Sequence, residues 1–549
     1  MTHDNAKKTI FYENAVVKVY DFPIFYFPKL SHPDPTVDRR SGFLIPSLYD
    51  TKNLGSGVSI PYFFDLGIDK NFTLTNRLYV SENPLFLGEY HQAFLNSSFL
   101  ADFGYTEGYK NTSTTKRSGE KSHFFGKFVK NFTSNSDYEN TLEINLQEVS
   151  NDKYLKLYKI DSNLVDYSTQ TLENSINFTQ EREDLFFGLS ASVYETIKSD
   201  YNDKYEFILP ELTIDKNLLS DDELGSLELQ TNYRAHNYDT NKVTNFLVND
   251  FNYESNDNLL NNVINTKILA NIKNINYESK NVDIYKNDTT SEIYGSIGFL
   301  SEINLEKIKN DTIHFLKPKF LMRFSPGSMR KESGGSRLTP SNAFNMNRIN
   351  NINNYETGMS STFGFDYKVK DKDNDVTKFD FSLAQIINEK ENKKMSDKSS
   401  LNEKLSDLVG SSNLHLTDNF EINYNFSIDQ NYNEFNYNET GATYDNGTLN
   451  LNFNYLSENK HIGDQDYFKT ELNIKNKEKG LLSFSTKRNL ITDSSEYYNL
   501  SYEYLNDCLR AGLVYRREFY NDSEVEPEDS LMFKLTLVPF GNLDSPKFD

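Results

Sequence analysis

The stretch FEINYNFSI, Phe420–Ile428, alternates between two kinds of side chain along its whole length. Every even-numbered position is apolar or aromatic, and every odd-numbered position is polar. A two-residue period is typical of a β-strand that has one apolar face and one polar face. The stretch therefore predicts a strand whose two faces meet different surroundings.

The same alternation recurs elsewhere, with turn-rich segments such as 444–447 and 458–464 between the alternating runs. The last run is less regular than the others because Met532 and Val538 are themselves apolar. The recurrence predicts an all-β chain. The additional runs are Leu449–Tyr455, Tyr498–Tyr504 and Leu531–Val538.

Charge and aromatic content exclude two classes of protein. The 549 residues include 58 Lys+Arg against 80 Asp+Glu, a formal net charge of −22. This balance argues against a nucleic-acid binder, which needs a basic face to neutralise the phosphates of its partner. Only 37% of the residues are hydrophobic, which taken alone would suggest a disordered chain. However, 14% are aromatic, and because disordered chains are poor in aromatic residues, this content argues against disorder.

Cysteine count and hydropathy limit the chain further. Cys508 is the single cysteine, so no disulfide can close within the chain and a cysteine-rich zinc site is excluded. No run of 18 apolar residues is present to form a transmembrane helix. No signal-peptide core is visible at the start, so we expect either a cytoplasmic chain or a missing true start.

A long sheet with two unlike faces can form a soluble sandwich or a membrane barrel. A sandwich of this length should divide into modules, but no Pro/Ser-rich linker separates one part from another. In a closed barrel with its apolar face toward lipid, every backbone polar group is paired and the lumen is polar. At roughly ten residues per strand and a similar number per connection, about 500 residues supply about 25 strands. We therefore predict a large antiparallel transmembrane β-barrel.

Three blocks of sequence resemble the LptD family of lipopolysaccharide-assembly outer-membrane proteins, also called OstA or organic solvent tolerance proteins. The first block is the most specific, and the other two support it. The first comprises Phe22–Pro28, His32–Pro35, Arg39–Pro46 and Ile60–Phe64, and the others are Arg337–Ile349 and Asn506–Arg517.

The resemblance implies a barrel of about 26 strands over 36–549 in the outer membrane of a Gram-negative bacterium. Residues 1–35 resemble the last rung of a periplasmic β-jellyroll and its crossing segment, so we expect most of that domain and the signal peptide to be absent. The implied function is to receive lipopolysaccharide and release it through a lateral gate between the first and last barrel strands. The implied partners are an LptA-like periplasmic bridge, an LptE-like lipoprotein plug in the lumen and the barrel-insertion machinery.

Pro46 and Pro61 match the family's prolines in the first two barrel strands, at the lateral gate. Proline has no N–H, so each removes one hydrogen bond from the ladder and weakens it. The alternative reading is that these prolines simply begin or end strands.

The last apolar run resembles the closing-strand signal that the insertion machinery reads. Because any barrel strand shows the same alternation, an ordinary strand is the alternative. The predicted closing-strand residues are Leu531, Phe533, Leu535 and Leu537.

Cys508 matches family cysteines that form disulfides with the amino-terminal jellyroll. The resemblance therefore implies a disulfide with a cysteine of the absent domain. A lone buried or idle thiol is the alternative.

Two other classes of function were weighed against lipid export. An outer-membrane lipid hydrolase needs a nucleophile beside a base, but none of the eight histidines lies in a nucleophile or zinc motif. The run 371–375 begins like a calcium loop but has Val376 where glycine is required. We therefore expect no enzyme activity, no metal site and no cofactor. A passive porin or a substrate-specific transporter is the remaining competitor among barrels.

Overall fold

A computed structural model describes most of the chain, and no described helix is long and apolar enough to span a membrane. The described residues are 2–4, 8–19, 22–33, 39–44, 46–113, 116–133, 138–197, 203–260, 263–332, 334, 337–349, 351–461, 463–476, 480–505, 510–519 and 528–536.

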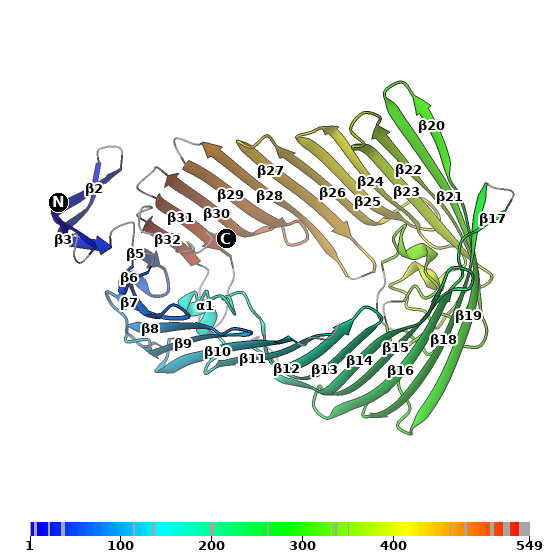
Figure 1. Ribbon diagram of the computed structural model, residues 1–549, viewed down its shortest axis with the longest axis horizontal. Coiled ribbons are helices and arrows are strands. Elements are labelled where there is room, and N and C mark those ends of the chain that lie inside the picture. The colour runs from blue at the N-terminus through cyan, green and yellow to red at the C-terminus, as the bar shows by residue number, and fades with distance from the viewer. Residues whose placement is uncertain are drawn as a thin grey trace.

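Nearly all the described residues belong to one closed ring of antiparallel strands (Figure 1). Three ring positions each hold two consecutive strands: β4 and β5 both pair with β6, β16 and β17 with β18, and β19 and β20 with β21. The 29 strands of the ring therefore occupy 26 positions. This confirms the predicted fold class and strand number.

The ring begins at β4 and closes when β32 returns to β5. Its strands are β4 (Gly42–Phe43), β5 (Ser47–Thr51), β6 (Gly55–Gly67), β7 (Lys70–Tyr79), β8 (Leu85–Ala93), β9 (Ser97–Gly108), β10 (Ser118–Thr133), β11 (Glu139–Val149), β12 (Thr171–Arg182), β13 (Leu185–Thr196), β14 (Tyr205–Asp221), β15 (Gly225–Tyr238), β16 (Lys242–Glu254), β17 (Asn258–Leu260), β18 (Ile264–Lys280), β19 (Thr290–Ile303), β20 (Leu305–Lys309), β21 (Thr312–Ser325), β22 (Gly358–Asp371), β23 (Thr377–Asn388), β24 (Leu408–Thr417), β25 (Phe420–Ile428), β26 (Phe435–Asp445), β27 (Leu449–Glu458), β28 (Gln465–Asn476), β29 (Gly480–Asn489), β30 (Ser494–Leu505), β31 (Arg510–Glu518) and β32 (Glu528–Thr536).

The alternating stretches are strands, and their apolar sides face away from the lumen, the interior of the ring. On β25, Ser427 is fully buried and donates a hydrogen bond to the buried carboxylate of Asp407, the last residue of the 389–407 connection. The polar positions of β25 therefore face inward and its aromatic positions outward. On β27, Leu451 and Phe453 are 36% and 39% exposed on the outer face. An apolar outside and a polar inside are the arrangement that a lipid bilayer requires of a barrel.

The two ends of the ring differ in the length of their connections. At one end the turns are short, such as 68–69 between β6 and β7 and 183–184 between β12 and β13. At the other end lie long connections, 150–170, 326–357 and 389–407. Short turns are typical of the periplasmic end of such barrels and long loops of the extracellular end. The end with the turns 68–69 and 183–184 is therefore the periplasmic end, and the end with the long connections is the extracellular one.

The long connections fold back into the ring instead of extending from it (Figure 1). Residues 150–170 contain the one α-helix of the described chain, α1 (Tyr154–Tyr158), which lies inside the ring near β8. The other two long connections contain the short 3-10 helices η1 (Asn342–Phe344) and η2 (Ser400–Asn402). Buried hydrophobic clusters form where these segments pack on the inner wall.

A separate three-stranded antiparallel sheet precedes the barrel and lies outside the ring, near its first strands (Figure 1). It consists of β1 (Thr2–Asp4), β2 (Thr9–Val19) and β3 (Phe22–Pro33). Arg40, just before β4, donates a hydrogen bond from its guanidinium to the hydroxyl of Thr9. The domain boundary between residues 35 and 36, and the assignment of this sheet to a jellyroll, stay predictions.

Candidate functional site: the seam between the first and last strands

The ring closes at a short contact between its first and last strands, which we call the seam. Among the described residues, β32 pairs antiparallel with β5 over five residue pairs, from Thr51 opposite Ser530 to Ser47 opposite Lys534. On its other side, β32 pairs with β31 over nine residues. The seam therefore has about half as many backbone contacts as the neighbouring strand pair.

Alternation along the seam separates a lipid face from a luminal face. The ring of Tyr49 lies 5.4 Å from that of Tyr79, which in turn contacts a tyrosine of α1 inside the barrel. Tyr49 therefore faces the lumen, and its neighbour Leu48 faces outward. Leu48 lies opposite Phe533, and Leu531 shares the face of Phe533. Two of the predicted closing-strand residues thus belong to the lipid face of the seam.

The first strand is interrupted beside the seam. β4 ends at Phe43 and β5 begins at Ser47, directly after Pro46. Pro61 lies within β6, and its carbonyl oxygen accepts a hydrogen bond of 2.9 Å from the backbone N–H of Leu44. In an antiparallel ladder the N–H and C=O of one residue point to the same side, so the donor that Pro61 lacks is missing on the side of the first strand. Pro46 stands at the start of a strand, as expected if the prolines simply begin or end strands. Pro61 lies inside a strand and does not fit that alternative.

The remaining predicted residues lie beyond the seam or outside the described residues. Leu535 lies in β32 opposite Ala511 of β31, past the last residue pair between β32 and β5. Leu537 and Cys508 lie outside the described residues, and Cys508 falls in the connection between β30 and β31. The roles assigned to the two prolines, the closing strand and Cys508 stay predictions.

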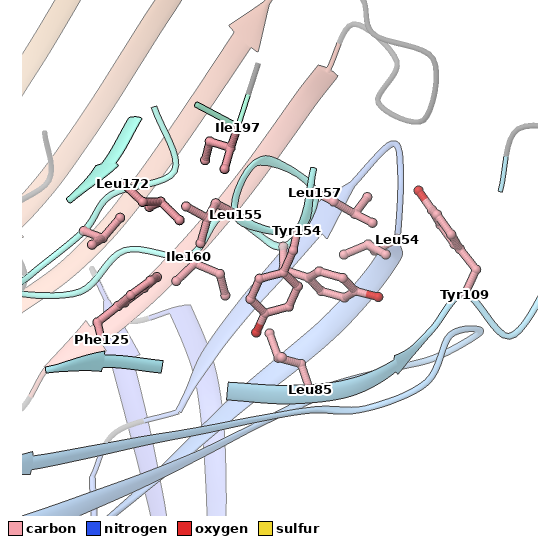
Figure 2. Packing of buried hydrophobic residues seen from close by; sticks show 12 residues of the cluster. Leu54, Leu85, Tyr109, Phe125, Tyr154, Leu155, Leu157, Ile160, Leu172 and Ile197 are labelled. Atoms are coloured by element: carbon pink, nitrogen blue, oxygen red, sulfur yellow. The ribbon is translucent and has the colours of Figure 1, made fainter. Parts of the chain in front are cut away.

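Inside the ring, residues 150–170 form what we call the luminal strap. Figure 2 shows Leu155 of α1 among apolar side chains from the barrel wall, which include Leu54 of the β5–β6 turn and Phe125 of β10. Arg77 of β7 donates a hydrogen bond of 2.6 Å to the carbonyl oxygen of Tyr158, which the end of the helix would otherwise leave unpaired. The buried cluster comprises Leu54, Leu85, Tyr109, Phe125, Tyr154, Leu155, Leu157, Tyr158, Ile160, Val165, Leu172 and Ile197.

A buried polar contact fixes the position of the strap on this wall. The hydroxyl of Tyr154 lies 3.1 Å from Nδ1 of His123, whose Nε2 forms a hydrogen bond with the Asp102 carboxylate. Burial raises the pKa of Tyr154, so its hydroxyl stays neutral. A Cβ at Gly104 would lie 2.6 Å from both the His123 ring and the Tyr154 hydroxyl, so glycine provides the space for this contact.

The strap also contacts the other side of the seam. The ammonium group of Lys159, at the end of α1, lies 2.7 Å from the Glu518 carboxylate on β31. The guanidinium of Arg516 on β31 lies 5.2 Å from the ring centroid of Tyr167 in the strap. One luminal segment therefore touches both walls that meet at the seam.

The strap is not among the elements predicted from the sequence. With five residues, α1 is too short to produce a helical period, and the strap occurs in a chain dominated by alternation. A usable signal was the spacing of Tyr154, Leu155, Leu157 and Tyr158, because apolar residues separated by three or four positions lie on one face of a helix.

A second unpredicted feature is a cluster of buried charges on the 326–357 segment. The guanidinium of Arg348 donates two hydrogen bonds to the Glu356 carboxylate, the one from Nε measuring 2.8 Å. Arg323, which is 1% exposed at the end of β21, places Nη1 3.7 Å from the same carboxylate. Burial alone would raise the pKa of Glu356, but the two guanidiniums hold it below its usual value. The cluster fastens this segment to the inner wall.

The described residues contain no candidate metal centre. Among those residues, no three His, Cys, Asp or Glu side chains gather in an arrangement that could hold a metal ion. The seam and the strap offer hydrogen bonds, apolar contacts and ion pairs, which can guide or retain a molecule without changing its covalent bonds.

Comparison with known proteins gives a consistent result. The family described as "LptD: LPS transport system D" matches residues 121–485. The LPS-assembly protein LptD of Psychrobacter cryohalolentis is 26% identical over 199 residues, which are 31% of this chain and 19% of that protein. The LPS-assembly protein LptD of Francisella tularensis subsp. holarctica is 30% identical over 146 residues, or 25% and 16% of the two chains. The aligned stretches thus span less than a fifth of these relatives' length.

The solved FrpB iron transporter of Neisseria meningitidis, F3-3 variant, aligns with 91% of this chain and 81% of its own, at 8% identity and a TM-score of 0.30.

The closed, outward-apolar ring defines a β-barrel protein of the outer membrane of a Gram-negative bacterium. The family match covers more than half of the residues. The chain belongs to the LptD family, the LPS transport system D.

Proposed function

We propose that this protein carries lipopolysaccharide to the outer leaflet and releases it sideways between β5 and β32, without catalysing a covalent step. The observation that carries the proposal is the seam of five residue pairs beside an interrupted first strand. A passive porin benefits from a fully paired ring and has no need of a weak closure. Lipid release through the wall requires one.

The physical argument rests on the cost of separating two strands within a membrane. Each ladder hydrogen bond contributes about 1 kcal/mol in water and more in lipid, where no water replaces it. Five residue pairs therefore resist parting far less than the nine pairs on the other side of β32. A lipid with an apolar tail and a polar head can cross the slit with its head in the polar lumen and its tail in the bilayer.

The proposed partners follow from the same assignment. The sheet β1–β3 belongs to a jellyroll that receives lipopolysaccharide from an LptA-like bridge, and the chain divides into 1–35 and 36–549. An LptE-like lipoprotein occupies the lumen, and the barrel-insertion machinery reads β32. Cys508 forms a disulfide with a cysteine that lies upstream of these 549 residues in the full-length protein.

Depleting the protein in its own host tests the transport function. We expect lipopolysaccharide at the cell surface, measured with an antibody on intact cells, to fall in step with the protein, because fewer barrels then release lipid into the outer leaflet. Re-expression of the wild-type protein should restore it. Normal surface lipopolysaccharide in depleted cells would overturn the proposal.

Replacing Pro61 with valine tests the missing donor at the first strand. The valine N–H restores a hydrogen-bond donor on that side of β6, and one such bond is worth about 1 kcal/mol. The added bond ties the interrupted first strand at Leu44 more firmly to β6 and so stiffens the edge that must separate from β32. We expect delivery of newly made lipopolysaccharide to slow by up to about fivefold, measured by pulse labelling. Pro318→Val in β21, a strand distant from the seam along the ring, is the matched control and should leave the rate unchanged. Unchanged delivery by the Pro61→Val protein would contradict a role for this proline in opening.

A further inference from the structure

We propose that the luminal strap is a latch that holds the seam closed from inside, and that the Lys159–Glu518 ion pair is the contact it releases. The inference rests on the proposed lateral release, since a latch has a role only if β5 and β32 separate. It concerns the regulation of that separation.

The strap is attached firmly on the side of the first strands. Its helix buries Tyr154, Leu155 and Leu157 against β8, β10 and β12, and the β5–β6 turn adds Leu54 to the same cluster. Arg77 of β7 and the buried His123 hold its backbone and its tyrosine. These contacts keep the strap with this wall when the ring opens.

On the side of the last strands the attachment is of a different kind. It consists of the ion pair between Lys159 and Glu518 and the stacking of Arg516 on Tyr167. The other oxygen of the Glu518 carboxylate pairs with Arg516 on the same strand, at 2.9 Å. The side chains of Lys159 and Glu518 are 22% and 21% exposed, so water can reach both. Exposed and partly exposed ion pairs are individually weak and exchange readily with solvent or other ions. The contact between the strap and β31 is therefore the one that can dissociate.

The placement of these contacts connects the strap to the seam mechanically. Glu518 is in β31, opposite Glu528 in β32, so a pull on β31 reaches the seam through the β31–β32 ladder. Leu54 lies in the turn directly after β5, the other strand of the seam. The strap thus ties the turn of the first hairpin to the last hairpin, and the seam cannot widen at this end while the ion pair is closed.

Hydrogen exchange of the purified full protein in lipid nanodiscs, without lipopolysaccharide, measures how often the seam opens. We expect Lys159→Glu and Glu518→Lys each to raise exchange of the peptides covering 47–51 and 528–536 about tenfold, because like charges then face each other across the latch. The double variant K159E/E518K restores the attraction with the signs reversed. It should return exchange most of the way to the wild-type rate, and the remainder reports the repulsion between the cation at position 518 and Arg516 on the same strand.

Two comparisons separate a latch from a general loss of structure. Reversing Lys127, which pairs with Glu143 between β10 and β11 on one wall, should leave exchange at the seam unchanged. Exchange in 377–388, which covers β23, should stay constant in every variant. Where a charge reversal fails to assemble, Lys159→Met and Glu518→Gln remove the pair without repulsion and should give a smaller rise of the same kind.

The inference is wrong if exchange at the seam does not rise in either single variant, or if the double variant stays as fast as the single ones. Because the measurement contains no lipopolysaccharide, it can fail while lateral release stands. Conversely, a protein whose seam is locked covalently and still delivers lipopolysaccharide refutes lateral release, whatever the exchange rates are.

Discussion

A disulfide between cysteines placed at Leu48 and Phe533 is expected to reduce lipopolysaccharide delivery to the level of cells depleted of the protein. These residues are directly opposite each other on β5 and β32. A covalent bond replaces a contact worth only a few hydrogen bonds, so the strands cannot part under any force the transport system applies. Surface lipopolysaccharide should recover when the disulfide is reduced, and non-reducing electrophoresis reports how much of the protein is locked.

A second cysteine pair controls for the effect of the disulfide itself. Val58 and Leu78 are opposite each other on β6 and β7, next to the seam but not across it. Locking this pair should leave delivery intact, because these strands stay together during release. Full delivery by the Leu48–Phe533 protein, with the bond shown to be formed, would exclude release between β5 and β32.

Glu356→Ala is expected to cause the largest loss of local stability, about 3–5 kcal/mol in the 326–357 segment. The substitution leaves the buried guanidiniums of Arg323 and Arg348 without their shared carboxylate, and removing one partner of a buried ion pair costs this amount. Hydrogen exchange of peptides covering 337–357 should accelerate about two-hundredfold to five-thousandfold. Unchanged protection there would mean that the cluster does not hold the segment.

An exposed pair provides the contrast for this prediction. Arg488 near the end of β29 forms an ion pair with Asp493 in the β29–β30 connection, and their side chains are 43% and 81% exposed. Arg488→Met should change local exchange by less than about fivefold, because exposed pairs contribute at most about 1 kcal/mol. The comparison isolates burial as the cause.

The pKa of Glu356 adds a pH dependence of known sign. A carboxyl whose pKa is lowered on folding stabilises the folded state fully above its unfolded pKa of about 4.3 and loses that contribution as the pH falls toward the lowered value. Protection of the segment should therefore be constant from neutral pH to about 5 and fall only in stronger acid.

The strands were predictable because their signal is local and repeated. In Phe420–Ile428 each side chain meets either lipid or the lumen, so the two-residue period appears in the sequence without reference to any partner strand. The number of strands followed from the length of chain that each needs to cross a bilayer.

The strap and the buried charges could not be predicted because they depend on contacts between distant residues. Lys159 and Glu518 are 359 positions apart, and neither has a neighbour in the sequence that marks it as one half of a pair. Glu356 and Arg323 look like ordinary solvated charges until the segment folds into the ring. For Pro46 the sequence indicated the family position but not the local structure. That this proline precedes β5 and does not lie within a strand is known only from the structure.

The break between β4 and β5 divides the closure into stages. The described ladder between β32 and β5 ends at Lys534 and Ser47, while β4 pairs only with β6 among the described strands. The two edges can therefore unzip progressively toward the long loops, at about 1 kcal/mol per backbone bond, instead of breaking every bond at once. A passing lipid would break only the backbone hydrogen bonds that its width requires, and these bonds would re-form one after another behind it.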